Sequence, residues 1–164
     1  MEIICFHNPD EENGYLSNWY LSDFEVNKTK FSSMEQFMMY QKALYFHDAD
    51  IASKILETSD AAYIKQLGRA VKNYNENDWN GVRQIIVYEG LTAKFSQNQF
   101  LKEQLLNTKE CLLAECAVKD KIWGIGLSMT DINRLDQSKW SGQNLLGYTL
   151  MMVRKQLKNG ADTM

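Results

Sequence analysis

The chain has 164 residues, of which 45% are hydrophobic and 24% are charged, a composition that suits one compact domain with a buried core and does not require disorder. Its formal net charge of −3 argues against broad affinity for nucleic acid through bulk electrostatics, but is compatible with a local basic pocket for one or two phosphates. No apolar run approaches the roughly 18 residues needed to span a bilayer, so we expect no membrane association.

The beginning of the chain is expected to form short strands joined by a loop. The segment EIICF (2–6) predicts a strand, because apolar and β-branched residues dominate it. The segment GYLSNWY (14–20) follows as a loop, and it contains Asn18. The segment FEVNKTKF (24–31) predicts a β-hairpin with Asn-Lys at its turn.

Helices are expected to dominate the middle of the chain. Apolar periodicity predicts them over residues 33–46, 49–57, 60–68, 78–95 and 97–107. A capping box, Ser32-x-x-Glu35, is expected to open the first helix. Asp48 and Ser59 are the candidate N-caps of the next two helices.

The last third of the chain predicts a strand, a turn and a closing helix. The segment CLLAECA (111–117) predicts a buried strand, and KIWGIG (121–126) predicts a strand or a turn that ends in glycines. The closing helix runs from about Asn144 to Lys158. Because no linker or repeat interrupts the chain, we expect one domain over 1–164, of the α+β class and mostly helical around a small β-sheet.

The cysteines and histidines favour neither a disulfide framework nor a metal site. Cys5, Cys111 and Cys116 have no CxxC spacing, and their odd number leaves at least one unpaired. The start MEIICFHNPD has no secretory-signal pattern, so we expect a reduced, cytoplasmic environment. His7 and His47 lack ligand-like neighbours in the sequence, so we expect no metal and no cofactor.

The helix expected over 33–46 holds an acid and a base among apolar residues. At 100° per residue, Glu35, Met39 and Lys42 share one face, whereas the other sides are also apolar. A helix that is apolar on nearly every side is buried, and a buried charge is costly unless it is paired. The pattern alone favours a Glu35 that closes the capping box and a Lys42 that extends to solvent. The alternative is the wall of a cleft, with the carboxylate facing a substrate.

Two further clusters suit a ligand, although each also has a simpler interpretation. In DWNGVRQ, Trp79 and Arg83 share a helix face, where an indole could stack a base and a guanidinium could grip phosphate. A core tryptophan beside an exposed arginine is the simpler interpretation. In KDKIWGIG, Asp120 precedes Trp123 and Gly124, and a glycine there allows the backbone to approach a ligand or marks an ordinary turn.

The start of the closing helix and two isolated cations complete the set of candidates. Asn144 could cap the closing helix, and the free amide groups of a helix N-terminus could hold an anion; both roles could be true together. Arg69 in LGRAV and Lys94 in AKFSQN add cations that are uninformative by themselves.

Taken in chain order, these segments resemble the NADAR family, also called YbiA-like proteins. The resemblance rests on GYLSNWY, FSSMEQFMMYQKALYF, LGRAVK, WNGVRQIIVYEGLTAKFSQN, LLNTKECLLAEC, DKIWGIG and WSGQNLLGYTLMMVRKQL, and it covers residues 14–157. Trp19 departs conservatively from the phenylalanine that the family has in its LSN-aromatic motif. The resemblance implies an α+β fold built mostly of helices, and N-glycosidase chemistry on phosphorylated ribosyl compounds.

Two substrates are compatible with this resemblance. One described activity of the family cleaves early riboflavin-pathway intermediates, which are pyrimidines with a 5-phosphoribosylamino group, into ribose 5-phosphate and the free aminopyrimidine. Another removes ADP-ribose from modified guanine in nucleic acid. A binding module that holds ADP-ribose-like ligands without cleaving them is the competing class. The expected partners are a small ribosyl phosphate and, for the second activity, ADP-ribosylated nucleic acid.

The motifs that carry the resemblance suggest roles for individual residues. The candidate catalytic residues are Glu35, Lys42 and Asp120. The candidate substrate-binding residues are Trp79, Arg83, Trp123, Gly124, Asn144, Asn18 and Arg69. On one route, Glu35 and Asp120 stabilise the positive charge that builds on the ribose or activate water. On another route, Lys42 captures C1 as a Schiff base while Glu35 shuttles protons. This route requires a neutral amine. Burial lowers the Lys42 pKa and an ionised Glu35 raises it, and the sequence leaves this balance open.

Overall fold

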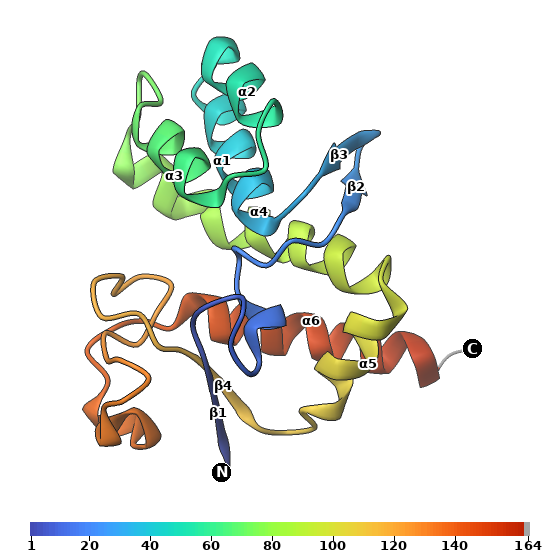
Figure 1. Ribbon diagram of the computed structural model, residues 1–164, viewed down its shortest axis with the longest axis vertical. Helices are drawn as coiled ribbons and strands as arrows, with labels where there is room; N and C mark the ends of the chain where they lie inside the picture. Colours follow the sequence, from blue (N-terminus) through green and yellow to red (C-terminus); the bar gives the residue numbers. More distant parts are fainter. Residues whose placement is uncertain (163–164) are drawn as a thin grey trace. The chain divides into compact units, whose positions relative to one another are not determined.

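The computed structural model describes residues 1–162, which form two compact units (Figure 1). One unit, called unit 2, is the continuous segment Leu21–Gln97. The other, unit 1, combines Met1–Tyr20 with the chain from Asn98 onward. The predicted α+β class is confirmed, and the described strands pair as two separate two-stranded sheets. The single-domain organisation stays a prediction.

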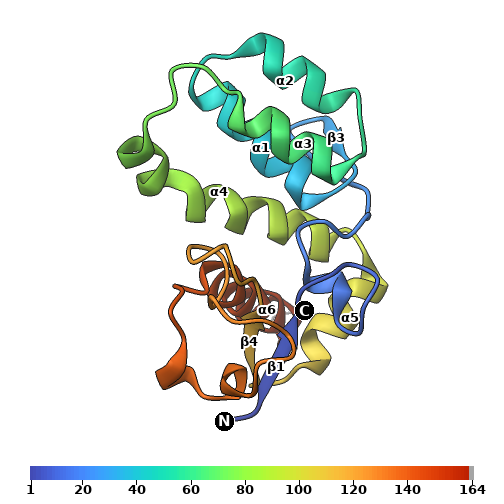
Figure 2. The same cartoon turned by 60° about the vertical axis from the view of Figure 1, so that its left-hand side comes forward.

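Unit 2 is a β-hairpin followed by helices packed around a central one. Its elements are β2 (Phe24–Val26), β3 (Thr29–Phe31), α1 (Met34–Tyr45), α2 (Ala49–Leu56), α3 (Ala61–Arg69) and α4 (Glu76–Ser96). The predicted hairpin is confirmed: Asn27 and Lys28 at its turn have φ of 50° and 66°, as a two-residue type I′ turn requires. Helix α1 contacts α2, α3 and α4, so the predicted buried helix is the centre of this unit (Figure 2).

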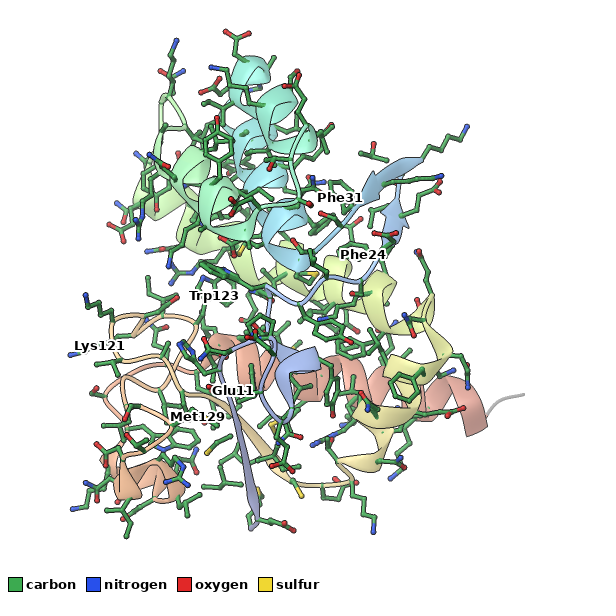
Figure 3. All side chains as sticks on the ribbon, in the orientation of Figure 1. Glu11, Phe24, Phe31, Lys121, Trp123 and Met129 are labelled. Atoms are coloured by element: carbon green, nitrogen blue, oxygen red, sulfur yellow. The ribbon has the colours of Figure 1, made fainter. Side chains whose placement is uncertain are left out.

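Aromatic side chains fix the hairpin to the start of α1. Phe24 and Phe31, which Figure 3 labels, come from the two strands, and Phe37 comes from α1. The ring centroids lie 5.8 Å apart for Phe24 and Phe31, 5.9 Å for Phe24 and Phe37, and 5.1 Å for Phe31 and Phe37. All three rings are buried, and each such pair adds about 1 kcal/mol beyond the burial of its area. The hairpin is thereby held where the chain enters α1.

Unit 1 joins a strand from early in the chain to a strand and helices from late in it. Its elements are β1 (Ile3–Phe6), the 3-10 helix η1 (Gly14–Leu16), α5 (Gln99–Asn107), β4 (Leu112–Glu115), the 3-10 helices η2 (Ile132–Leu135) and η3 (Gln137–Lys139), and α6 (Leu145–Asp162). Strands β1 and β4 lie side by side and pair in parallel, with Ile3 opposite Leu112 (Figure 2). Helix α6 packs on β4, and all four residues of β4 are buried. The segment 121–126 is a turn and not a strand.

Side-chain caps decide where the helices begin. The predicted N-cap Asp48 is confirmed, because its Oδ1 accepts a hydrogen bond from the Ile51 amide over 3.1 Å. The predicted N-cap Ser59 is wrong, because Asp60 caps α3 by accepting from two amide groups. Both residues are good caps, so the sequence pattern does not separate them. Helix α4 begins earlier than predicted, since Asn75 caps it.

The described residues give no sign of a membrane segment or a metal centre. None of their helices is long and apolar enough to cross a bilayer. No group of three or more His, Cys, Asp or Glu side chains in this part of the chain is arranged to hold a metal ion. Cys5, Cys111 and Cys116 are free thiols.

Candidate functional site

Helix α1 is capped by residues one position later than predicted. Ser33 is the N-cap, and its Oγ accepts a hydrogen bond from the Gln36 amide over 3.1 Å. The Gln36 Oε1 in turn accepts from the Ser32 amide over 2.7 Å. The predicted box Ser32-x-x-Glu35 is therefore wrong, because Gln36 supplies the side chain that closes the cap. Glu35 is only 5% exposed. Because Gln36 closes the cap, capping does not explain why this carboxyl is buried.

Lys42, two turns after Glu35, is held by α3. Its Nζ donates a hydrogen bond to the Gly68 carbonyl oxygen over 2.8 Å and lies 4.4 Å from the centroid of the Tyr74 ring. Gly68 permits this close approach of the helices, because a Cβ there would collide with the sulfur of Met39. The amine therefore has a defined position beside α1 and does not extend freely into solvent.

The electrostatic balance at Lys42 favours its neutral form more than in an ordinary lysine. Burial lowers the pKa of Lys42 below its usual 10.5, the Glu35 carboxylate opposes this shift, and the Arg69 guanidinium adds to it. The net direction is downward, so burial outweighs Glu35, which the sequence could not establish. The amine is thus better suited to nucleophilic attack, which requires the unprotonated form.

Trp79 is part of a packed aromatic cluster, as the simpler interpretation predicted. Its ring centroid lies 6.3 Å from that of Tyr45 and 6.3 Å from that of Phe46, and it is buried. The centroid of Phe46 lies 5.3 Å from that of Tyr74. Tyr74 is 43% exposed and lies beside the Lys42 amine, so it offers a ligand more ring surface than Trp79 does. The sequence analysis did not single out Tyr74.

Arg83, one turn after Trp79, is a buried cation with an unsatisfied donor. It is 8% exposed, so the predicted exposed arginine is wrong, and its Nε has no hydrogen-bond partner among the described residues. Burial and the Glu76 charge raise the pKa of Tyr74, whereas the Arg83 charge lowers it. The Arg83 guanidinium is therefore an electrostatic neighbour of the Tyr74 ring. A buried donor without a partner is costly, so the Nε of Arg83 suits an anionic ligand.

Asp120, Trp123 and Gly124 form one interlocked turn in unit 1. The Asp120 Oδ1 accepts hydrogen bonds from the amides of Ile122 and Trp123 over 3.0 Å and 2.9 Å. Gly124 is buried, and a Cβ there would lie 2.8 Å from the Cβ of Ala117. These contacts give Asp120 and Gly124 structural roles in the turn. The Trp123 side chain, labelled in Figure 3, is half-buried.

Asn144 holds strand β4 instead of capping α6. Its Oδ1 accepts from the Glu115 amide over 3.0 Å, and its Nδ2 donates to the Leu113 carbonyl oxygen over 2.8 Å. The predicted N-cap side chain is therefore wrong. The amides of Leu145 and Leu146 donate to the carbonyl oxygens of Ile122 and Trp123, so they do not support the predicted anion site.

Asn18 and Arg69 differ in burial. Asn18 follows η1 in unit 1, is 8% exposed, and its Oδ1 has no hydrogen-bond partner in the described part of the chain. Arg69 is exposed at the end of α3, where its charge acts on Lys42. Unit 2 therefore brings Glu35, Lys42 and Arg69 together.

Two buried charged residues were absent from the predicted site. Lys94 on α4 is fully buried, and burial lowers its pKa to about 7. Glu115 ends β4; burial raises its pKa, which a hydrogen bond with His7 Nδ1 over 2.9 Å opposes. The Glu115 Oε2 has no partner among the described residues. Each had a sequence signal, because Lys94 shares a helix face with Leu91 and Glu115 ends an apolar run.

Comparison with known proteins identifies relatives of this chain. The sequence model of the NADAR domain matches residues 5–158. The chain is 38% identical to N-glycosidase R617 of Acanthamoeba polyphaga mimivirus, over 94% of this chain and 96% of that protein. It is 34% identical to a riboflavin biosynthesis protein of Vibrio vulnificus, over 96% of this chain but only 39% of that longer protein.

A solved structure has the same fold. The NMR structure of Escherichia coli YbiA superposes with a TM-score of 0.81 at 27% sequence identity, and covers 98% of this chain and 87% of that one. The E. coli protein of this name is called an N-glycosidase. The family that the ordered motifs predict is thus confirmed, and the chain belongs to the NADAR family of N-glycosidases.

Proposed function

We propose that this enzyme hydrolyses the N-glycosidic bond of phosphorylated ribosylaminopyrimidines, the early intermediates of riboflavin biosynthesis, to ribose 5-phosphate and the free aminopyrimidine. The observation that carries the proposal is the half-buried Lys42 amine, with a lowered pKa, beside Glu35 in a member of an N-glycosidase family. The substrate class is supported by the Vibrio vulnificus relative, which is named a riboflavin biosynthesis protein.

The lowered pKa of Lys42 favours the Schiff-base route over direct attack by water. The ribose ring opens to an imine between C1 and the pyrimidine amino nitrogen. The neutral Lys42 amine adds to C1, and the C1–N bond to the pyrimidine breaks, which releases the aminopyrimidine and leaves an imine at Lys42. Water then adds to this imine and releases ribose 5-phosphate and the free lysine.

Glu35 is the proposed proton carrier for these steps. Its charge acts on Lys42, so the two groups are electrostatic neighbours. It would accept the proton that Lys42 loses on adding to C1 and return a proton to the departing amine. Asp120 stays a candidate for charge stabilisation, although its Oδ1 already accepts two backbone hydrogen bonds.

Arg83 and Tyr74 are the proposed contacts of unit 2 to the rest of the substrate. The buried Arg83 has an unpartnered Nε among the described residues, and a guanidinium binds phosphate with charge-assisted hydrogen bonds. The Tyr74 ring is exposed beside Lys42 and can pack against the substrate. Trp79 supports this ring through Phe46.

A substrate panel tests the proposal. The purified protein is incubated with the aminopyrimidine ribosylamine phosphates and, separately, with ADP-ribosylated guanine in DNA, and the released bases are measured by mass spectrometry. Release of the aminopyrimidine at the higher kcat/KM is expected. Release from ADP-ribosylated guanine alone would establish the alternative family activity. Tight ADP-ribose binding without any released base would instead indicate a binding module.

A further inference from the structure

Two free thiols lie against each other on neighbouring strands of unit 1. Cys5 on β1 stands opposite Ala114 on β4, and Cys116 lies two residues farther along the same face. The Cys116 amide donates to the Phe6 carbonyl oxygen over 2.8 Å, which extends the strand pairing to this position. Cys5 packs against the buried cluster that contains Cys116, and the Cys116 thiol donates to the Ala114 carbonyl oxygen over 3.8 Å. The fold therefore brings together two sulfur atoms that are far apart in the sequence.

The two thiols differ in accessibility. Cys5 is partly exposed, whereas Cys116 is 1% exposed and packs with Ala114 and Ile125 in a buried cluster. A dissolved reagent therefore reaches Cys5 first. Cys116 is the buried thiol of the pair.

Arg134 supplies a cation at this pair. The charge of its guanidinium acts on Cys5, and its Nη1 donates to the Asp131 carbonyl oxygen over 3.0 Å. Its Nε is buried without a hydrogen-bond partner among the described residues. The indole of Trp140 donates to the Arg134 carbonyl oxygen over 2.9 Å, which fixes the backbone there. A guanidinium with an unsatisfied donor suits an anionic sulfur.

The acidities of the thiols agree with this geometry. The neighbouring Cys116 thiol lowers the pKa of Cys5 to about 7, with help from the charge of Arg134 and against the effect of burial. The neighbouring Cys5, together with burial, raises the pKa of Cys116. Burial also raises the pKa of Cys111, which is partly exposed like Cys5 and is therefore a matched control within the same chain.

We propose that Cys5 is a reactive thiol that peroxide oxidises, that Cys116 resolves the product to a disulfide, and that Arg134 positions and stabilises the Cys5 sulfur. Hydrogen peroxide transfers one oxygen to the Cys5 thiolate and, with one proton, gives a sulfenic acid and water. The Cys116 thiol then attacks the Cys5 sulfur, the S–O bond breaks, and a second water leaves. The pair loses two electrons in total, and a dithiol reductant restores both thiols.

Alkylation of the wild-type protein tests the reactivity of Cys5. With iodoacetamide at pH 7 and peptide mapping, Cys5 should react more than about tenfold faster than Cys111, since its thiolate fraction is larger. Arg134→Gln should slow the reaction of Cys5 severalfold and leave that of Cys111 unchanged, whereas Arg134→Lys should retain most of the rate. Equal rates for the two cysteines would overturn the proposal.

Oxidation tests the role of Cys116. Treating the Cys111→Ser protein with hydrogen peroxide should lower its mass by two hydrogens and yield a Cys5–Cys116 peptide, and a dithiol should reverse both changes. The further variant Cys116→Ser should instead leave a sulfenic acid at Cys5 that reacts with dimedone. If Cys5 in the Cys111→Ser protein is overoxidised and no Cys5–Cys116 peptide forms, Cys116 is not the resolving thiol. This outcome can be read even if the Cys116→Ser variant fails to fold.

Discussion

The Nζ of Lys42 donates a hydrogen bond to the Gly68 carbonyl oxygen over 2.8 Å, which joins the side of α1 to the last turn of α3. Because a Cβ at position 68 would collide with Met39, this glycine sets how closely the two helices approach. The position of the proposed nucleophile thus depends on the packing of the two helices as well as on its own side chain.

Lys42→Met should remove turnover, because no amine then attacks C1. We expect a loss of at least about a hundredfold in kcat. Borohydride added during turnover of the wild-type protein should attach a ribose phosphate to Lys42, detected by peptide mass spectrometry. Lys54→Met, at an exposed lysine of α2, is the matched control and should keep full activity. An unlabelled Lys42 in an assay that traps a known Schiff-base enzyme would favour attack by water.

Neighbouring residues at the start of α1 should separate catalysis from capping. Glu35→Gln should lower kcat by about a hundredfold or more and leave the melting temperature nearly unchanged, because Glu35 does not close the cap. Ser33→Ala should keep kcat and lower the free energy of unfolding by about 1 kcal/mol, because it removes the N-cap. Urea unfolding and steady-state kinetics on both variants check this. Unfolding of Glu35→Gln would indicate a structural role instead.

Arg83→Gln should weaken binding of the substrate phosphate. We expect KM for a phosphorylated substrate to rise about tenfold or more, and KM for its dephosphorylated counterpart to stay the same. Because its Nε has no partner among the described residues, the loss of melting temperature should be small. An equal rise in KM for both substrates would argue against a phosphate contact.

Asn144→Ala should destabilise the protein, because it leaves two buried backbone groups of β4 without partners. The expected loss in the free energy of unfolding is on the order of 3 kcal/mol. Asn144→Gly should cost less, because Asn144 has a φ of 53°, which glycine adopts easily. Denaturant unfolding measures both, with Asn133→Ala at an exposed position as the control.

Lys94 should make stability depend on pH. Its pKa is about 7 in the folded protein and near 10.5 when unfolded, so the unfolded chain binds more protons between these values. The stability of the wild-type protein relative to Lys94→Met should therefore rise by up to about 1.4 kcal/mol per pH unit from pH 7 to 10.5. Below pH 7 the difference should be constant. A difference independent of pH throughout would mean that Lys94 stays charged in the fold.

Helices, strands and turns were easier to predict from the sequence than the contacts of particular side chains. The Asn27-Lys28 turn and helix α1 were predictable, because turn chemistry and apolar periodicity are local. The N-cap of α1 was one residue off, since Ser32 and Ser33 are equally good caps by residue type. Gln36, which closes the cap, is also held by the distant carbonyl oxygens of Ile55 and Thr58. The use of Asn144 at β4 was not predictable, because it depends on a strand distant in the chain.

The parallel pairing of β1 with β4 has a consequence for synthesis on the ribosome. Ile3 pairs with Leu112, so β1 emerges long before its partner, and at roughly 5–20 residues per second it waits roughly 5–20 s. Unit 2 is continuous and emerges whole within that interval. We expect stalled nascent chains to resist proteolysis in unit 2 before β1 becomes protected. Until β4 appears, Cys5 is without the strand that leads into Cys116.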